Sequence, residues 1–446
     1  MSEKKPSAGI YTLGCKVNQY ESEAIAEELE RGGVTVLPPT EVCDAYVINT
    51  CTVTAESDRK ARQFIRRAIA RNPKAYIVVT GCLAQTAPDS LRAISGIDSI
   101  VGNTKKLGAA HEVMRLLKNG EKPESAEIHV ESIEDSAFEP MQIKAFERTR
   151  AYIKIEDGCE NRCTYCIIPN ARGKVRSKLP EDVISEVTRL TCSGCREVVL
   201  TGIETASYGK DLSKGDLTSL LESIDKIEGI GRVRLGSLDP SMIREDIAAR
   251  LGSLGSLGSL APHFHLSLQS GSSRVLALMK RKYNARQAMR SIELLREHIP
   301  NVQFTTDVIV GFPGETDEDF AETVEFCKKA RFLMVHIFPY SPRRTTPAAS
   351  MSGQIPEDVK RKRLHELEAV VSEIRRELCE EKLSRSPVCE VLFETYENGV
   401  SFGHTADFFE IAVPSERPMH GELASVRLER TDGKLCYGVL CHSADN

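Results

Sequence analysis

The order of apolar and polar positions along the chain predicts an α/β protein. Near the N-terminus, residues 10–14, 45–50 and 76–81 are short apolar, β-branched runs, and longer helical stretches lie between them. This alternation predicts parallel strands with crossover helices. Ligands of such sheets bind at the carboxyl ends of the strands.

A second alternating pattern begins at Ala151. Six candidate strands share short length and apolar or β-branched character: Tyr152–Ile155, Glu197–Leu200, Arg232–Leu235, Phe264–Leu268, Phe304–Val310 and Met334–Phe338. Helical stretches separate them, which predicts a partial (β/α)6 barrel with its chemistry at the carboxyl ends of the strands. The Leu-Gly-Ser repeat at residues 251–260 predicts a flexible surface excursion.

Changes in pattern divide the chain into parts. Residues 1–120 form the first α/β domain, and the polar, acidic stretch 121–150 is predicted to be a linker. The barrel domain covers residues 151–380. Residues 386–446 consist of short strands separated by Gly, Asn and Pro, which predicts a small all-β domain.

The length and amino-acid composition are typical of a large protein in a reducing compartment. The 446 residues are 41% hydrophobic, and no apolar run approaches the length needed to span a membrane. The N-terminus has no stretch of signal-peptide type. We therefore expect the 14 cysteines to be thiols in the cytoplasm rather than disulfides.

Three cysteines on one short loop are the strongest chemical signal in the sequence. Cys159, Cys163 and Cys166 follow the first barrel strand, with three and then two residues between them. Three thiolates can hold three irons of a [4Fe–4S] cluster and leave the fourth iron open. In this spacing the open iron usually chelates S-adenosylmethionine, which an electron from the cluster cleaves to a carbon radical. The alternative is a structural zinc loop, but no fourth ligand follows at a fitting distance.

A second set of cysteines stands at the ends of the three N-terminal runs. Cys15, Cys51 and Cys82 each come at or just after such an end, so the sheet could bring them together. We infer a second three-thiolate cluster; the alternative is three unrelated buried thiols. Cys192 and Cys195 form a C-x-x-C pair at the end of a predicted helix, where we expect a structural role.

Several motifs resemble one family. They lie at residues 12–18, 49–54, 80–85, 166–177, 268–272 and 307–316. Together they are similar to the methylthiotransferases of the radical S-adenosylmethionine superfamily. Thr12-Leu13-Gly14-Cys15-Lys16-Val17-Asn18 resembles the MtaB-type branch, which acts on threonylcarbamoyladenosine in tRNA. Two other branches, which act on isopentenyladenosine and on a ribosomal protein, have different residues around the first cysteine.

The resemblance implies a function and a set of partners. It implies transfer of a methylthio group to carbon 2 of N6-threonylcarbamoyladenosine at position 37 of tRNA. It also implies two [4Fe–4S] clusters, S-adenosylmethionine, and a C-terminal RNA-binding barrel of the TRAM type. The expected partners are the tRNA anticodon stem-loop, an electron donor such as flavodoxin or ferredoxin, and a sulfur source, with no membrane.

Positions at the barrel strands suit S-adenosylmethionine. We predict cofactor contacts from Thr201, Gly202, Ser267, Gln269 and Asp307, because these residues end or lie within the second, fourth and fifth barrel strands. No catalytic side chain is assigned beyond the cluster cysteines. His263 and His265 alternate on one strand, and we expect them to make hydrogen bonds inside the barrel.

Two further observations leave alternatives open. Basic runs follow Cys51, on a helix that includes Arg62 and Arg66, and also follow the radical motif, from Arg172 to Lys178. They are either RNA-phosphate contacts or solvated helix faces. Glu204 and Thr345 stand where the family more often has other residues. The competing functions are the same reaction on isopentenyladenosine or a ribosomal protein aspartate, and a non-catalytic iron–sulfur or zinc RNA-binding protein.

Overall fold

Residues 7–129 contain a fully parallel six-stranded sheet. The computed structural model describes residues 5–134, 136–146, 149–343 and 345–441. The sheet has the order β2-β1-β3-β4-β5-β6. Its strands are β1 (Ser7–Thr12), β2 (Thr35–Leu37), β3 (Ala45–Thr50), β4 (Tyr76–Gly81), β5 (Ser99–Val101) and β6 (Glu127–His129). Strands β3 and β4 are buried throughout, as expected for a parallel sheet that helices cover on both faces.

Helices α1 (Lys16–Arg31) and α5 (Gly108–Asn119) pack on one face of this sheet, through residues such as Ile25 and Val113. Helix α2 (Ala55–Arg71) packs on the other face through Ala61 and Ile65. The short helices are α3 (Cys82–Thr86) and α4 (Pro88–Arg92). The segment predicted as a linker contributes β6 to the sheet edge.

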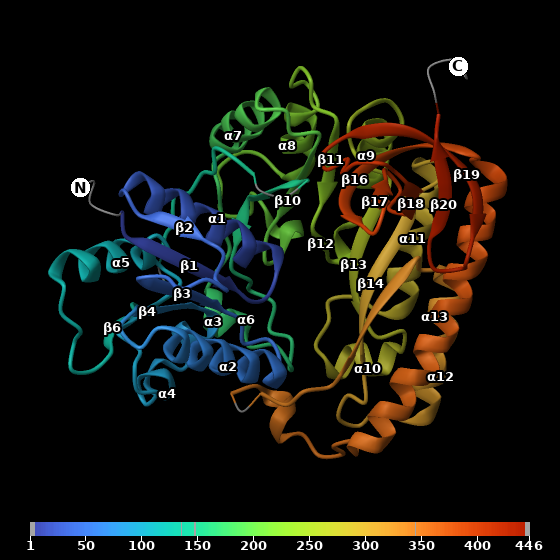
Figure 1. The fold of residues 1–446 in the computed structure, drawn as a ribbon. Helices are drawn as coiled ribbons and strands as arrows, with labels where there is room; N and C mark the ends of the chain where they lie inside the picture. The colour runs from blue at the N-terminus through green and yellow to red at the C-terminus, as the bar shows by residue number, and fades with distance from the viewer. Residues whose placement is uncertain (1–4, 135, 147–148, 344, 442–446) are drawn as a thin grey trace.

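The central part of the chain is an open barrel of parallel strands (Figure 1). The six predicted strands are confirmed: β7 (Ala151–Lys154), β10 (Glu197–Thr201), β11 (Arg232–Leu235), β13 (His263–Gln269), β14 (Gln303–Val310) and β15 (Met334–Pro339). These strands form two sheets, one of order β11-β10-β7 and one of order β12-β13-β14-β15, in which β12 is Ser237–Leu238. A single β-bridge between Val233 and Leu260 links the two sheets. Two short strands, β8 (Glu156–Asp157) and β9 (Arg176–Ser177), flank the cysteine loop.

The helices of the barrel alternate with its strands. They are α6 (Ile168–Arg172), α7 (Pro180–Cys192), α8 (Leu217–Ile224), α9 (Glu245–Leu257), α10 (Ser273–Leu278), α11 (Ala285–His298) and α12 (Asp317–Ala330). Single 3-10 turns lie at Thr205–Ser207, Pro240–Met242 and Pro347–Ser350. The Leu-Gly-Ser repeat lies largely in α9, where Leu251 and Leu254 are buried in the barrel core. The prediction of a flexible excursion there is wrong, because Leu251 and Leu254 are three residues apart on the helix and both face the core.

The C-terminal part is a closed five-stranded barrel reached through the long helix α13 (Glu357–Arg385). Its strands are β16 (Val388–Glu397), β17 (Val400–Thr405), β18 (Glu410–Pro414), β19 (Leu423–Thr431) and β20 (Cys436–Leu440). Phe408, between β17 and β18, stacks on His263 with ring centroids 4.2 Å apart. Arg234 donates to the Ala406 carbonyl oxygen at 3.1 Å. The small barrel therefore covers the end of the large barrel where its strands begin.

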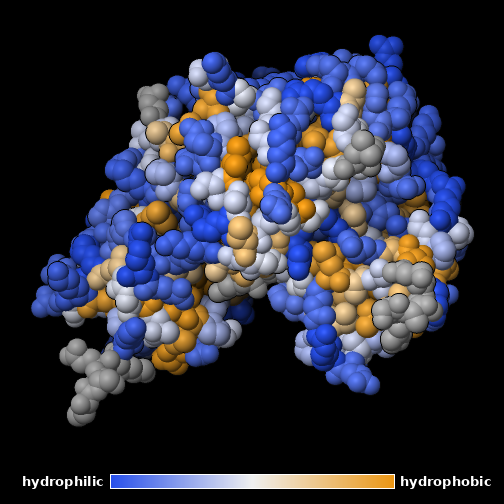
Figure 2. Space-filling view, turned by 90° about the horizontal axis from the view of Figure 1, so that it is seen from above, coloured by the Kyte–Doolittle hydropathy of each residue, from blue (hydrophilic) through white to orange (hydrophobic). Residues whose placement is uncertain are grey.

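The surface seen from above is mostly hydrophilic, with apolar residues scattered over it (Figure 2). None of the helices in the described part of the chain combines the length and apolar character that crossing a bilayer requires.

Candidate functional site: two facing cysteine triads

The N-terminal triad, Cys15, Cys51 and Cys82, is assembled from three strand ends. Strands β1, β3 and β4 are neighbours in the sheet, and each leads into one of these cysteines. Burial raises the pKa of Cys51 to about 12, and the nearby thiols of Cys82 and Cys15 contribute to the rise. The structure therefore brings together three cysteines that are far apart in the sequence.

Glycines allow this close approach. Gly14 and Gly81 precede Cys15 and Cys82, and both have left-handed φ values, 103° and 101°. A Cβ at Gly14 would lie 2.8 Å from the Cβ of Cys51, and one at Gly81 would overlap the backbone of Thr50. Only glycine fits at these two turns.

The radical triad, Cys159, Cys163 and Cys166, lies on the loop that follows β8. The pKa of Cys159 is raised to about 12 and that of Cys166 to about 11, and burial is the main cause of both shifts. Such thiols hold their protons at neutral pH, so a bound metal is what would release them as thiolates.

One cavity connects the radical triad with Cys15 of the N-terminal triad. Its volume is about 360 Å³, and its walls include Cys15 and all three cysteines of the radical triad. Cys82 of the N-terminal triad is also close enough to Cys166 to contribute to the raised pKa of Cys166. Four predicted cofactor contacts line the cavity: Gly202, Ser267, Gln269 and Asp307. Thr201 does not line it, because its side chain is buried and its carbonyl oxygen accepts from the Ile155 amide at 2.9 Å.

Each triad receives a hydrogen bond from a buried arginine. Arg172 Nε donates to Cys82 Sγ at 3.4 Å, and Arg281 donates to Cys163 Sγ at 3.3 Å. Hydrogen bonds to cluster sulfurs are among the features by which proteins tune iron–sulfur clusters. The guanidinium groups therefore suit an anionic iron–sulfur group in each triad.

Arg172 is the centre of a buried charge network. It pairs with Glu21 and lies 3.2 Å from Asp157, and Lys106 and Lys154 also reach Glu21, at 3.2 and 2.9 Å. The partners come from both halves of the molecule, so no local sequence signal could have identified them. Glu21 has its pKa held well below its usual range because these cations outweigh its burial.

Part of the RNA-phosphate hypothesis is wrong. In the basic run after the radical motif, Arg172, Arg176 and Lys178 are buried and turn inward to carboxylates. They cannot form a phosphate-binding surface. On α2, Arg66 and Arg67 are exposed. RNA-phosphate contact by the basic residues of this helix therefore stays a prediction.

The donor set suits a polynuclear cluster better than a single zinc ion. Zinc with thiolates at about 2.3 Å would bring the sulfurs within about 4 Å of one another. In the described chain, the groups whose ligand atoms all lie within 4.8 Å of one another include neither cysteine triad. A cubane spreads its ligands more widely and needs only soft thiolates.

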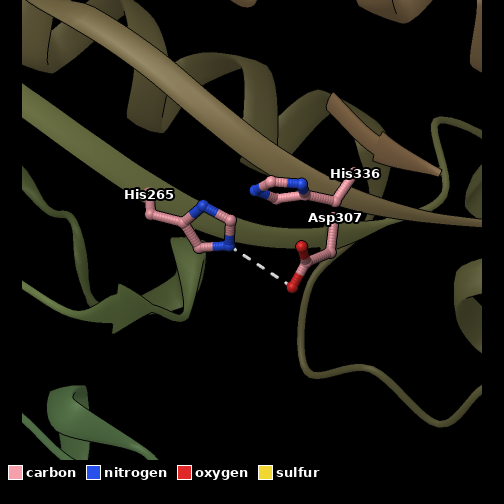
Figure 3. Close-up of side chains that lie close together, drawn as sticks. All are labelled: His265, Asp307 and His336. Atoms are coloured by element: carbon pink, nitrogen blue, oxygen red, sulfur yellow. Dashed lines mark ion pairs between the residues drawn. The ribbon is translucent and has the colours of Figure 1, made fainter. Parts of the chain in front are cut away.

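A second group of polar side chains lies inside the barrel. His265 Nδ1 and His263 Nε2 contact Thr305 Oγ1 at 2.9 and 3.0 Å, which confirms the predicted hydrogen bonding. His265 Nε2 lies 3.3 Å from Asp307 Oδ2, and His336 points toward both (Figure 3). Burial and the nearby Arg234 guanidinium lower the pKa of Lys16, which also interacts with Asp307.

Glu204 is a carboxyl group at the site with an unusual environment. Its side chain lines the cavity and accepts from Asn161 Nδ2 at 3.0 Å. Burial, with a smaller contribution from Asp239, raises the pKa of this carboxyl to about 7. The residue that departs from the family pattern is therefore part of the site.

Comparison with known proteins agrees with this arrangement. Residues 7–102 match the Uncharacterized protein family UPF0004, and residues 153–327 match the Radical SAM superfamily. The fold is similar to that of the radical S-adenosylmethionine methyltransferase TsrM from Kitasatospora setae, at a TM-score of 0.54 and 18% identity. That similarity covers 78% of this chain and 77% of the other.

Curated relatives span nearly the whole chain. It is 39% identical to threonylcarbamoyladenosine tRNA methylthiotransferase MtaB of Bacillus subtilis, over 95% of this chain and 93% of that protein. It is 40% identical to the MtaB of Thermotoga maritima over 82% of each chain. It is also 35% identical to tRNA-2-methylthio-N(6)-dimethylallyladenosine synthase of Carboxydothermus hydrogenoformans, over 99% of this chain.

The barrel, the radical triad and the superfamily match define a radical S-adenosylmethionine enzyme, which uses a [4Fe–4S] cluster. At this identity and coverage, the chain belongs to the methylthiotransferase family of that superfamily, whose members carry two clusters.

Proposed function

We propose that this chain transfers a methylthio group to carbon 2 of N6-threonylcarbamoyladenosine at position 37 of tRNA. The observation that carries the proposal is that the radical triad and Cys15 of the N-terminal triad line one cavity. Methylthiolation of a carbon needs a radical source and a sulfur source at the same atom. The names of relatives from four organisms support the threonylcarbamoyl substrate.

We assign one [4Fe–4S] cluster to Cys159, Cys163 and Cys166, and the other to Cys15, Cys51 and Cys82. When bound, the two groups supply the electron that cleaves S-adenosylmethionine and the site that carries the sulfur. Arg281 and Arg172 would fix one ligand of each cluster through the sulfur contacts described above. Their buried charges also offset the negative charge that thiolates introduce.

Four of the proposed S-adenosylmethionine contacts line the same cavity as the radical triad. The backbone at Ser267 is held in place, since its carbonyl oxygen accepts from Arg281 at 3.1 Å and from the Tyr283 hydroxyl at 2.5 Å. Gln269 ends β13 in a left-handed conformation, with φ 70°. Gly202 leaves room beside the Glu156 carboxylate. Thr201 would contribute only its backbone, as the last residue of β10.

Glu204 would hold a proton in this cavity. With a pKa near 7, its carboxyl is largely neutral at slightly acidic pH and avoids adding negative charge next to Cys159. Asn161 orients it from the cysteine loop itself.

The partners follow from the reaction. The target base must be unstacked, because a base inside a helix cannot reach a buried cavity. The anticodon stem-loop presents such a base, and the exposed Arg66 and Arg67 on α2 are candidate phosphate contacts. An electron donor of the flavodoxin or ferredoxin type, a sulfur source and a cytoplasmic location complete the proposal.

The test is nucleoside mass spectrometry of tRNA from cells that lack the gene, with and without a plasmid copy. We expect 2-methylthio-threonylcarbamoyladenosine to be absent without the gene and restored by the wild type. The variants Cys51→Ala and Cys163→Ala should restore none. If the 2-methylthio derivative of isopentenyladenosine changes instead, the substrate assignment is wrong and the chemistry stands. If no methylthio nucleoside changes, a ribosomal protein aspartate becomes the leading substrate.

A further inference from the structure

Three side chains of the barrel form a cluster that the cysteine chemistry does not use. His265, Asp307 and His336 stand on the neighbouring strands β13, β14 and β15 and point toward one another (Figure 3). Asp307 is the register partner of His336, and His265 is the register partner of Thr305. One imidazole nitrogen from each histidine and one carboxylate oxygen all lie within 4.8 Å of one another. The barrel therefore offers a set of two histidines and one carboxylate as ligands.

The spacing of the closest pair fits two ligands of one metal ion. His265 Nε2 lies 3.3 Å from Asp307 Oδ2. Zinc binds histidine nitrogen and carboxylate oxygen at about 2.0–2.2 Å in tetrahedral geometry, which places two such atoms about 3.4 Å apart. A hydrogen bond between the two side chains has a similar length but involves no third donor. The convergence of His336 on the same space is what distinguishes a metal site from a simple pair.

Thr305 holds His265 in the orientation that a metal ligand needs. Its Oγ1 lies 2.9 Å from His265 Nδ1, and Nε2 is the ring nitrogen directed toward Asp307. With the proton on Nδ1, that nitrogen donates to the Thr305 hydroxyl and Nε2 presents its lone pair. Metal-binding histidines almost always use their second ring nitrogen in this way, which fixes the tautomer and the orientation of the ring.

The cluster borders the cavity that contains the radical triad. Asp307 lines this cavity, as do Ser267 and Gln269 on β13. His336 has an exposed side chain, which provides an entry path for an ion. Three protein ligands leave at least one position of a zinc ion open, as in catalytic rather than structural zinc sites.

We propose that His265, Asp307 and His336 bind one divalent transition-metal ion of the zinc type, separate from both cysteine triads, and that its open position takes an oxygen donor. Imidazole and carboxylate suit such an ion, whereas iron–sulfur clusters need soft thiolates. The proposal does not depend on which nucleoside is the substrate. Only Oδ2 of Asp307 faces His265, so the contact with S-adenosylmethionine predicted for Asp307 is compatible with a bound ion.

A second group of side chains provides a matched control. Glu112, Glu127 and His129 also bring ligand atoms within 4.8 Å of one another. Arg115 lies 2.8 Å from Glu112 Oε2 and pairs with Glu127 as well, so a cation already neutralises both carboxylates. We therefore expect this group to bind no metal.

The experiment measures zinc bound by the reconstituted enzyme, in which iron fills the two triads. After dialysis against micromolar zinc, elemental mass spectrometry should find about one zinc per chain in addition to about eight irons. X-ray absorption at the zinc edge should show nitrogen and oxygen at about 2.0–2.2 Å and no sulfur. Sulfur at about 2.3 Å would place the zinc on cysteines and overturn the proposal.

Variants assign the ion to the three residues. His336→Phe and Asp307→Asn should weaken zinc binding at least about hundredfold, because loss of a group behind a ligand alone costs about 10–100-fold. Thr305→Val removes the hydroxyl behind His265 and should weaken zinc binding about tenfold to hundredfold, whereas Thr305→Ser should restore it. His129→Phe should leave zinc binding unchanged.

Iron content and the free energy of unfolding should be the same in Thr305→Val as in the wild type, so its loss of zinc cannot come from misfolding. Zinc that both His336→Phe and Asp307→Asn retain would overturn the proposal, as would zinc that only His129→Phe removes. An enzyme that binds no zinc beyond its clusters would also overturn it. Because zinc binding is measured without tRNA, the nucleoside test of the proposed function can fail while this site stands.

Discussion

The two cysteine triads reach similar arrangements by opposite routes. The radical triad comes from one short loop, so its geometry depends on the local backbone, with Gly158 in a left-handed conformation at its start. The N-terminal triad comes from three strand ends, so its geometry depends on the order β1-β3-β4 in the sheet. A local site can be recognised by spacing, whereas a non-local site is only as stable as the fold around it.

The triads are nevertheless built together. Arg172 ends α6, just after the radical loop, yet it donates to Cys82 of the other triad. Its carboxylate partner Glu21 lies on α1 of the N-terminal domain. The carboxylates beside the two triads also differ. Cations hold the pKa of Glu21 low, whereas burial of Glu204 outweighs the effect of its neighbouring cations and raises its pKa.

The largest expected effect comes from removing one triad at a time. Replacing Cys159, Cys163 and Cys166 by Ala should remove about four of about eight irons and abolish the cleavage of S-adenosylmethionine. Replacing Cys15, Cys51 and Cys82 by Ala should remove the other four and leave that cleavage in place, while methylthio transfer is lost. Iron and sulfide analysis with detection of 5′-deoxyadenosine checks both.

Loss of all iron in either variant would show that the triads do not hold separate clusters. Stoichiometric zinc in place of iron would contradict both cluster assignments.

The second prediction concerns the arginine that joins the two halves. Arg172→Met should lower the free energy of unfolding by about 3–5 kcal/mol, because Glu21 and Asp157 lose a partner while buried. Arg281→Met should cost less, since its carboxylate partner among the described residues is Asp239 alone, at 2.9 Å. Urea unfolding of the two variants measures the difference. Equal losses would contradict the view that Arg172 connects the halves.

The third prediction uses pH to separate the two carboxylates. Glu204 titrates near its ordinary value of 4.5 when unfolded and at about 7 when folded, so the folded state binds the proton more tightly. The free energy of unfolding therefore falls as pH rises from about 4.5 to 7, and above pH 7 the full loss of about 3 kcal/mol is present.

Glu204→Gln should remove this dependence, so the variant should be more stable than the wild type at pH 8 and similar at low pH. Urea titrations of the cluster-free chain at several pH values give the measurement. If the free energy of unfolding of the variant shows the same pH dependence as that of the wild type, Glu204 is not the group responsible for it.

Much of the fold and of the cysteine chemistry could be predicted from the sequence. Strands of apolar, β-branched residues that end at Cys15, Cys51 and Cys82 are a local signal, and the parallel sheet turns it into proximity. The buried roles of Arg172 and Arg281 could not be predicted, because a basic side chain next to a motif is equally compatible with solvent or RNA. Helix α9 could not be predicted from its repeat, because the Gly and Ser residues obscure the helical spacing of Leu251 and Leu254.

The smallest expected effect concerns the C-x-x-C pair outside both triads. Cys192 is exposed at the end of α7, whereas Cys195 is buried and its thiol donates to the Glu197 carbonyl oxygen at 3.2 Å. Their side chains therefore differ in environment and do not form a matched ligand pair. Cys192→Ser should change the free energy of unfolding by less than about 0.5 kcal/mol and leave iron content and methylthio transfer unaltered. A loss of iron in this variant would mean that cluster binding extends beyond the six cysteines of the two triads.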